Sequence, residues 1–277
     1  MEIEFNITDN LSIKTNDRIS IFGRTGSGKT FFAKNWLLPH YNRYVFWDIK
    51  HENIDIEHDI IINTPKELKQ KIFEYNKILY QPKNPTDKDF NEICQIIFES
   101  RNISLYVDES SIISTPSKIL FWHNIILTQG RTYGVGIINT SQRPRIIHNT
   151  LISESEHLFI FSLNLDTDVL KIRQQIGEAS DDIRLLPEHH VLYHNVRLNR
   201  SYIFKPVKLL SKFSYSSIHK AYFNETMVNV IEKKQKVSQK RSAAALSRKT
   251  LANTIKNNMP AKTVNKKSIA NLNNLMI

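Results

Sequence analysis

The sequence predicts an α/β fold in which a mainly parallel sheet is covered by helices on both faces. Strand-like and helix-like periods alternate along most of the chain, as they do in folds of this class. The predicted strands "LYV", "VGII" and "LFIF" are apolar on both sides, which is typical of strands buried between two helical layers. A glycine-rich loop also joins one predicted strand to one predicted helix. With 277 residues, of which 40% are hydrophobic, the chain can hold one such domain and an appendage.

The elements follow from short apolar runs separated by turn residues and from amphipathic segments with capping signals. Thr64, Pro65 and Glu67, for example, have the spacing of a helix start: an N-cap, a proline at the first helical position and an acidic residue three positions after the cap. Strands are expected at 3–7, 11–14, 18–23, 43–50, 77–82, 103–110, 133–142, 157–163, 189–195 and 201–207. Helices are expected at 29–38, 64–75, 86–100, 116–129, 146–154 and 166–177.

Charge is distributed unevenly along the chain. Residues 1–232 carry 27 basic and 27 acidic residues, whereas residues 233–277 carry 11 basic residues and no acidic one. We therefore expect one folded domain over 1–210 and a basic tail over 211–277 that is partly disordered or helical, because the end of the chain has too little apolar surface to fold alone. The tail could bind a polyanion, or it could be a solvated end that aids solubility.

The single cysteine, Cys94, excludes an internal disulfide, and its amphipathic surroundings predict a buried thiol in a reducing compartment. The N-terminal segment "MEIEFN" does not have the pattern of an export signal, and no apolar run approaches the length of a membrane span. We expect neither export nor membrane insertion.

The loop between the strand at 18–23 and the helix at 29–38 fits the phosphate-binding pattern Gly-x-x-x-x-Gly-Lys-Ser/Thr without departure. Glycines let backbone N–H groups turn toward a polyphosphate, the lysine reaches the β- and γ-phosphates, and the threonine hydroxyl is a magnesium ligand. The alternative is a glycine-rich turn that contains a lysine by chance and binds no phosphate. The predicted nucleotide-binding residues are Gly23, Arg24, Thr25, Gly26, Ser27, Gly28, Lys29 and Thr30.

Polar residues follow two other predicted strands at the edge of the sheet where ligands bind. Asp108 ends an apolar run and is expected to hold Mg²⁺ through its water shell, and Glu109 is expected to activate the attacking water. Gln142, after Ser141, could hold that water or sense the γ-phosphate. The alternative is that all three are ordinary polar strand ends. Since no Asn-Lys-x-Asp stretch is present to read guanine, ATP is the expected nucleotide.

The segments "GRTGSGKT", "YVFWDIKHEN", "LYVDES" and above all "GRTYGVGIINTSQRPRIIHNTLISESEHLFIFSLNLDTD" resemble the FtsK/HerA superfamily of DNA-pumping P-loop ATPases. The resemblance covers about residues 15–175. Because the chain is short, it looks most similar to the genome-packaging ATPases of tailless double-jelly-roll viruses. The resemblance implies a RecA-like (ASCE) core, double-stranded DNA as partner, and a ring of subunits, commonly a hexamer. It also implies a capsid or portal-vertex partner and location in the host cytoplasm or with the virion.

The resemblance further implies that Arg131 reaches the γ-phosphate held by a neighbouring subunit. A structural role at a helix end remains open for this residue, and Arg143 and Arg145 are competing candidates. Asp48, Lys50 and Glu52 follow another strand, and their role is open. His189, His190 and His194 lack a metal-binding pattern and are expected to be strand and loop residues.

Three other functions fit the sequence less closely. The first is a cellular or plasmid HerA-like ATPase for DNA transfer or repair. The second is a monomeric P-loop kinase, although residues 160–205 contain no compact arginine-rich lid. The third is a nucleotide-dependent interaction protein that relies mainly on its basic tail. The sequence therefore predicts an ATP- and Mg²⁺-dependent translocase of double-stranded DNA, with viral genome packaging as its most specific form.

Overall fold

A computed structural model describes residues 13–83 and 85–206, and all of them belong to one compact unit. They form a nine-stranded sheet in the order β3-β4-β2-β5-β6-β1-β7-β8-β9. Neighbours from β3 to β7 run parallel, and β8 and β9 continue the sheet antiparallel. The predicted α/β class with a mainly parallel sheet is confirmed. The strands are β1 Arg18–Phe22, β2 Tyr44–Trp47, β3 Ile60–Ile62, β4 Lys77–Tyr80, β5 Ile103–Val107, β6 Val135–Ser141, β7 His157–Ile160, β8 Val191–Asn195 and β9 Arg200–Phe204.

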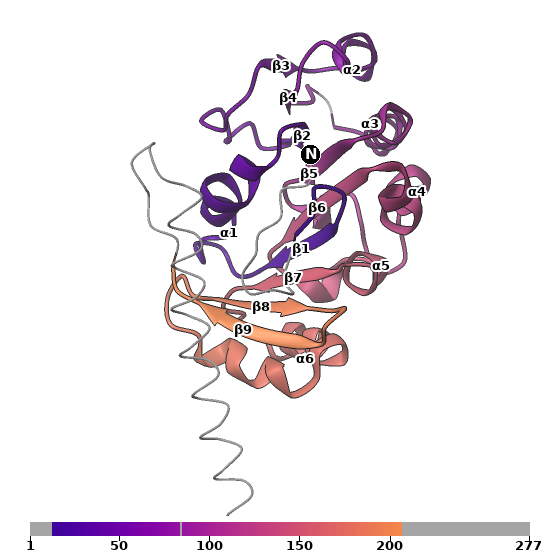
Figure 1. Cartoon of the computed structure of the whole chain (residues 1–277). Coiled ribbons are helices and arrows are strands. Elements are labelled where there is room, and N and C mark those ends of the chain that lie inside the picture. The colour runs from indigo at the N-terminus through magenta and orange to yellow at the C-terminus, as the bar shows by residue number, and fades with distance from the viewer. Residues whose placement is uncertain (1–12, 84, 207–277) are drawn as a thin grey trace, which may run out of the picture. The chain divides into compact units, whose positions relative to one another are not determined.

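Helices cover both faces of this sheet (Figure 1). Helix α1 lies on one face, and α3, α4 and α5 lie on the other. The helix that begins at α1 continues through a wider π turn and a 3-10 turn to His40, and Pro39 lies in its last turn. The α-helices are α1 Lys29–Phe32, α2 Pro65–Lys71, α3 Asp87–Ser100, α4 Phe121–Gln129, α5 Thr150–Ser153 and α6 Asp166–Ile176.

Two helix starts have the caps that their sequences predict. The Thr64 hydroxyl accepts a hydrogen bond from the Glu67 N–H, and Thr86 caps α3 in the same way through the Asp89 N–H. The Glu67 carboxylate reaches back one residue further than a capping box requires and accepts from the Asn63 N–H. Both caps satisfy backbone donors that would otherwise lack a partner.

Some expected elements differ from the observed ones. The helix expected at 116–129 begins only at Phe121, because the chain first makes a small turn in which Thr115 and Lys118 pair as an isolated bridge. The helix expected at 146–154 is shortened to α5, which a 3-10 turn at Pro144–Ile146 precedes. Strand β3, which was not predicted, pairs with β4 at the sheet edge. Of the strand expected at 11–14, Ile13 and Lys14 are not in a strand, and the other two residues lie outside the described part of the chain, as does the strand expected at 3–7. The boundary predicted near residue 210 and the basic tail also lie outside it.

The core is built from the apolar strands and the inner faces of the helices. The central strands β2, β5, β6 and β7 are buried at every position, as expected for strands between two helical layers. Cys94 on α3 is fully buried, as predicted, and burial raises the pKa of its thiol. Among the described residues, no helix is long and apolar enough to cross a membrane.

Gly136 lies where β6 passes close to the segment before β1. A Cβ atom at this position would be 2.1 Å from the Thr15 carbonyl oxygen and 3.0 Å from Asn16 Cα. Only glycine leaves room for this backbone contact, so the second glycine of "YGVGII" has a packing role.

Candidate nucleotide-binding site

The predicted phosphate loop joins β1 to α1 at the carboxyl edge of the sheet. Gly26 and Gly28 have φ angles of 75° and 101°, values that glycine adopts at little cost, and Gly28 directly precedes the helix. The loop is fixed to the sheet by backbone hydrogen bonds from the Gly23 N–H to the Ser141 carbonyl and from the Arg24 N–H to the Ser162 carbonyl. The sequence pattern therefore lies in the strand–loop–helix context that a phosphate cradle requires.

Lys29 lies within this loop. Its Nζ donates hydrogen bonds to the carbonyl oxygens of Gly23 at 2.6 Å and Arg24 at 3.0 Å. Burial lowers the pKa of Lys29 to about 8, and the nearby carboxylates of Glu109 and Asp108 act in the opposite direction. The ammonium group is thus poorly solvated and only partly compensated, which favours an anionic ligand beside it.

Ser27, like Lys29, has a polar group in this loop that suits a ligand. Its Oγ is buried and has no hydrogen-bond partner among the described residues. Buried hydroxyl groups normally have a partner. An unpaired hydroxyl inside a loop of this geometry fits a phosphate oxygen as the missing acceptor.

The two predicted acidic residues follow β5 and take different directions. Asp108 is buried and accepts a hydrogen bond from the Thr140 hydroxyl on the neighbouring strand. Glu109 has a left-handed backbone conformation, with φ 59° and ψ 68°, which costs a residue with a Cβ about 1–2 kcal/mol. Its N–H donates to the same Thr140 hydroxyl. This turn separates the two carboxylates. Thr140 holds both residues, and no motif marked it as a site residue.

The Glu109 carboxylate contacts the end of β6. Its Oε1 accepts hydrogen bonds from the Ser111 hydroxyl at 2.6 Å and, at 3.4 Å, from the Ser141 hydroxyl and the Gln142 N–H. The Gln142 side chain in turn accepts a hydrogen bond from the Thr25 hydroxyl of the phosphate loop at 2.7 Å. The structure therefore brings together the loop, Glu109 and Gln142, which lie far apart in the sequence.

Asp48, at the end of β2, belongs to the same edge. It is fully buried and accepts hydrogen bonds from the Asn53 N–H, the Asn53 side chain and the Gln81 side chain. Burial raises the pKa of Asp108, and the charges of Asp48 and Glu109 raise it further, whereas Lys50 lowers it.

This donor set fits a hard divalent cation. Mg²⁺ prefers oxygen ligands and keeps much of its water shell. A hydroxyl at Thr30 and a carboxylate at Asp108 are ligands of that kind, and repulsion among the carboxylates of Asp48, Asp108 and Glu109 would be relieved by a bound cation.

Arg131 lies elsewhere. It is in a 3-10 turn directly before β6, so the length of that strand, about 20 Å, separates it from the phosphate loop of its own subunit. Its guanidinium is 48% exposed and lies 3.6 Å from Glu156, which also binds Arg18 and Arg197. A role for Arg131 in its own nucleotide site is therefore excluded by position.

The competing arginines lie at the carboxyl end of β6. Arg143 makes an ion pair with the buried Asp168 of α6, and the same carboxylate accepts the Arg145 N–H. Asp168 was not singled out from the sequence, because one acidic residue in the first turn of a helix is an ordinary helix-start feature.

The fold and the loop define a P-loop nucleotide-binding α/β core. No protein-family model matches the chain. The chain is 27% identical over 203 residues to the DNA packaging ATPase P9 of Enterobacteria phage PRD1. The match covers 69% of this chain and 87% of P9. It also superposes on the genome packaging NTPase B204 of Sulfolobus turreted icosahedral virus 2 in complex with ATP-gammaS, with a TM-score of 0.63 and 18% identity, covering 71% of this chain and 100% of B204. The B204 complex with AMPPCP gives a TM-score of 0.62.

These matches confirm the predicted resemblance to genome-packaging P-loop ATPases. The chain is a homologue of P9, and it shares the fold of B204.

Proposed function

We propose that this protein is an ATPase that drives double-stranded DNA into a preformed viral capsid. The observation that carries the proposal is the assembly of Lys29, Asp108, Glu109 and Gln142 around one phosphate loop. This assembly occurs in a chain that is homologous to a DNA packaging ATPase over most of its length.

In this proposal the backbone N–H groups of residues 23–30 and the Lys29 ammonium bind the triphosphate. Thr30, and Asp108 through the water shell, would hold Mg²⁺, which would neutralise charge on the triphosphate. Glu109 accepts the proton of the attacking water. Gln142 is hydrogen-bonded to Thr25 of the loop and to Glu109. A movement of the loop on binding the γ-phosphate would therefore change the contact between Gln142 and the proposed base.

The proposal includes a ring in which Arg131 acts on the nucleotide of the adjacent subunit. Its distance from its own phosphate loop and its half-exposed side chain support an intermolecular role. An arginine supplied in this way is worth about 10³- to 10⁵-fold in rate. The basic tail, residues 211–277, would contact DNA or the capsid, and the protein would act in the host cytoplasm or on the virion.

The test is ATP hydrolysis with and without duplex DNA, measured over a range of protein concentrations. We expect stimulation by DNA and a specific activity that rises with concentration as rings form. A rate that is indifferent to both would refute the motor.

Mixing the Arg131→Ala and Glu109→Gln variants tests the intermolecular arginine. Each variant alone is expected to be inactive, and mixed rings should recover activity where an intact Arg131 faces an intact Glu109. Without recovery, Arg131 would be assigned to the ion-pair cluster around Glu156.

A further inference from the structure

Three buried polar side chains lie next to the turn that carries Glu109, and the proposed mechanism does not use them. They are Ser110, which follows Glu109, Asn139 on β6 and His123 on α4, and each is at most 1% exposed. The Ser110 hydroxyl donates a hydrogen bond to Asn139 Oδ1 at 3.2 Å. His123 Nε2 lies 3.3 Å from the same oxygen. We call these three residues the Asn139 cluster.

The protonation of His123 follows from its burial. Burial lowers the pKa of His123 to about 4, and the hydrogen bond to Asn139 acts in the opposite direction. At neutral pH the ring is therefore uncharged, and its one proton is on Nε2, which faces the Asn139 oxygen. His123 Nδ1 and Asn139 Nδ2 are also buried and have no hydrogen-bond partner among the described residues. Apolar side chains would fill this space without that cost, so the polarity of the cluster calls for a role beyond packing.

The turn beside the cluster is strained and carries the proposed base. Glu109 has a φ angle of 59°, in the left-handed region, so its backbone stays there only while neighbours hold it. The Thr140 hydroxyl accepts a hydrogen bond from the Glu109 N–H, and Asn139 accepts one from the hydroxyl of the next residue, Ser110. Thr140 and Asn139 are successive residues of β6, so their side chains point to opposite faces of the sheet. The strained turn is thereby held from both faces.

We propose that Ser110, Asn139 and His123 are positioning residues that keep the Glu109 carboxylate aligned to take a proton from the attacking water. The inference rests on the proposed ATPase function and on Glu109 as its base. His123 supports the Asn139 amide from α4, and Asn139 in turn fixes Ser110. Without the contact at Ser110, the turn relaxes toward ordinary backbone angles and moves the carboxylate. None of the three residues belongs to the phosphate loop, so the cluster acts on the chemical step and not on nucleotide binding.

The experiment measures kcat and KM, and ATP affinity by calorimetry, for variants of the full-length protein. Ser110→Ala should lower kcat by about 3- to 10-fold, the effect of one hydrogen bond on the barrier, and leave ATP affinity within about twofold. His123→Leu should act in the same way, and His123→Gln should retain most of kcat because its amide N–H can replace the Nε2 donor. Ser155→Ala is the matched control, since Ser155 is a buried serine that bonds the Leu151 carbonyl before β7, at the opposite edge of the sheet. It should change neither quantity.

A double-mutant cycle with Glu109→Gln separates positioning from a merely structural role. If the cluster acts through the base, Ser110→Ala should lower the residual turnover of Glu109→Gln by less than about twofold, whereas a general loss of packing would lower both backgrounds equally. Ser110→Ala removes a single oxygen atom, so this test does not depend on the folding of His123→Leu.

An unchanged kcat in Ser110→Ala, or an equal loss of kcat and ATP affinity, would overturn the positioning role. It would leave the ATPase proposal intact as long as Glu109→Gln is inactive. If Glu109→Gln kept its turnover, the assignment of the base and the positioning role would fail together.

Discussion

Replacing Lys29 with methionine should abolish ATP turnover and, in the absence of nucleotide, stabilise the fold. In the folded chain burial lowers the pKa of Lys29 to about 8 from 10.5. At neutral pH the protein therefore folds with a charge that its surroundings disfavour by about 3 kcal/mol, since each pKa unit corresponds to about 1.4 kcal/mol. The methionine side chain has a similar length and no charge.

Two hydrogen bonds reduce that gain. The Nζ group donates to the Gly23 and Arg24 carbonyls, and both acceptors lose this donor in the variant. Allowing for their loss, we expect a net gain of about 1–2 kcal/mol in the free energy of unfolding. For a domain of this size that gain raises Tm by roughly 2–8 °C.

The pH dependence of the free energy of unfolding tests the sign of this stability change independently. Between pH 8 and pH 10.5 the unfolded chain keeps a proton on Lys29 that the folded chain has lost, so the stability of the unaltered protein rises with pH through this window. The advantage of Lys29→Met should therefore be complete at pH 7 and much smaller near pH 10.

Thermal unfolding monitored by circular dichroism, with and without Mg²⁺-ATP, measures both effects. Nucleotide should raise Tm of the unaltered protein and leave Lys29→Met unchanged, because a ligand stabilises only a fold that binds it. Lys118→Met is the control, since Lys118 is a half-exposed lysine paired with Asp87 and should contribute less than about 1 kcal/mol. A Lys29→Met variant that is less stable than the unaltered protein at pH 7 would refute the reasoning.

Three further predictions concern the same edge of the sheet and its packing. Glu109→Gln should keep ATP binding and lower kcat by about 10²- to 10⁴-fold, and a near-normal single-turnover rate would exclude Glu109 as the base. Gly136→Ala should cost about 2–3 kcal/mol in denaturant unfolding, because its Cβ would meet the Thr15 carbonyl at 2.1 Å, and an unchanged midpoint would contradict this packing. Asp48→Asn should move the acid limb of the pH profile of kcat/KM to lower pH. Burial raises the pKa of Asp108, and the charges of Asp48 and Glu109 raise it further, so removing the Asp48 charge lowers that pKa. An acid limb at an unchanged pH would show that Asp48 does not act on Asp108.

The order of helices and strands could be predicted because each depends on local signals. Strand β5, for instance, is an apolar run that ends in Asp108, and α3 begins with a threonine that caps it. Strand β3 was missed because it has only three residues and its middle residue, Ile61, is exposed at the sheet edge. Its hydrogen bonds to β4 are a tertiary feature that a short window does not contain.

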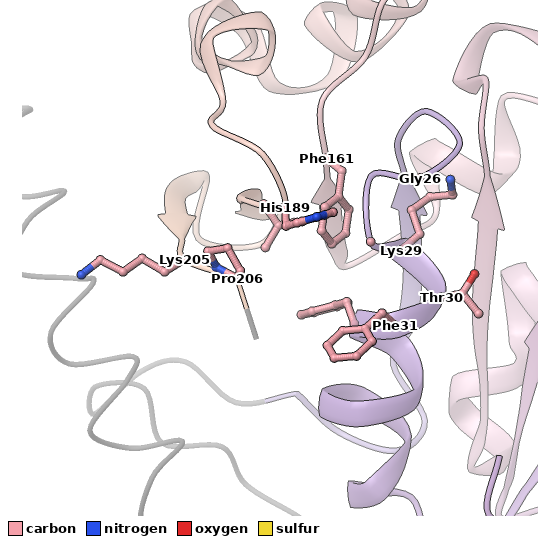
Figure 2. Close-up of a pocket in the computed structure, with 11 residues that line it drawn as sticks. Gly26, Lys29, Thr30, Phe31, Phe161, His189, Lys205 and Pro206 are labelled. Carbon is pink, nitrogen blue, oxygen red and sulfur yellow. The ribbon is translucent and has the colours of Figure 1, made fainter. Parts of the chain in front are cut away.

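In the site, too, residues marked by local sequence signals could be predicted and residues brought together by tertiary contacts could not. The phosphate loop, Asp108 and Glu109 could be predicted because a motif and strand ends mark them. The aromatic side chains that line the cavity beside the phosphate loop (Figure 2) could not be predicted. Phe31, Phe161 and His189 lie in three separate segments that meet only through the pairing of β1 with β7 and of β7 with β8. Nothing in the local sequence distinguishes these aromatic residues from core residues.

The conformation described here also explains how nucleotide binding could reach Glu109. The Lys29 ammonium group now donates to carbonyls of its own loop, so a triphosphate must replace those contacts when it draws the ammonium group to its oxygens. The same loop contains Thr25, which is hydrogen-bonded to Gln142, and the Gln142 N–H donates to the Glu109 carboxylate. A shift of the loop therefore disturbs a chain of two hydrogen bonds that ends on the proposed base. The Gln142 N–H and the Ser141 hydroxyl contact the Glu109 carboxylate at 3.4 Å and are easily lost, whereas the Ser111 hydroxyl at 2.6 Å keeps the carboxylate attached to its own turn when the loop shifts.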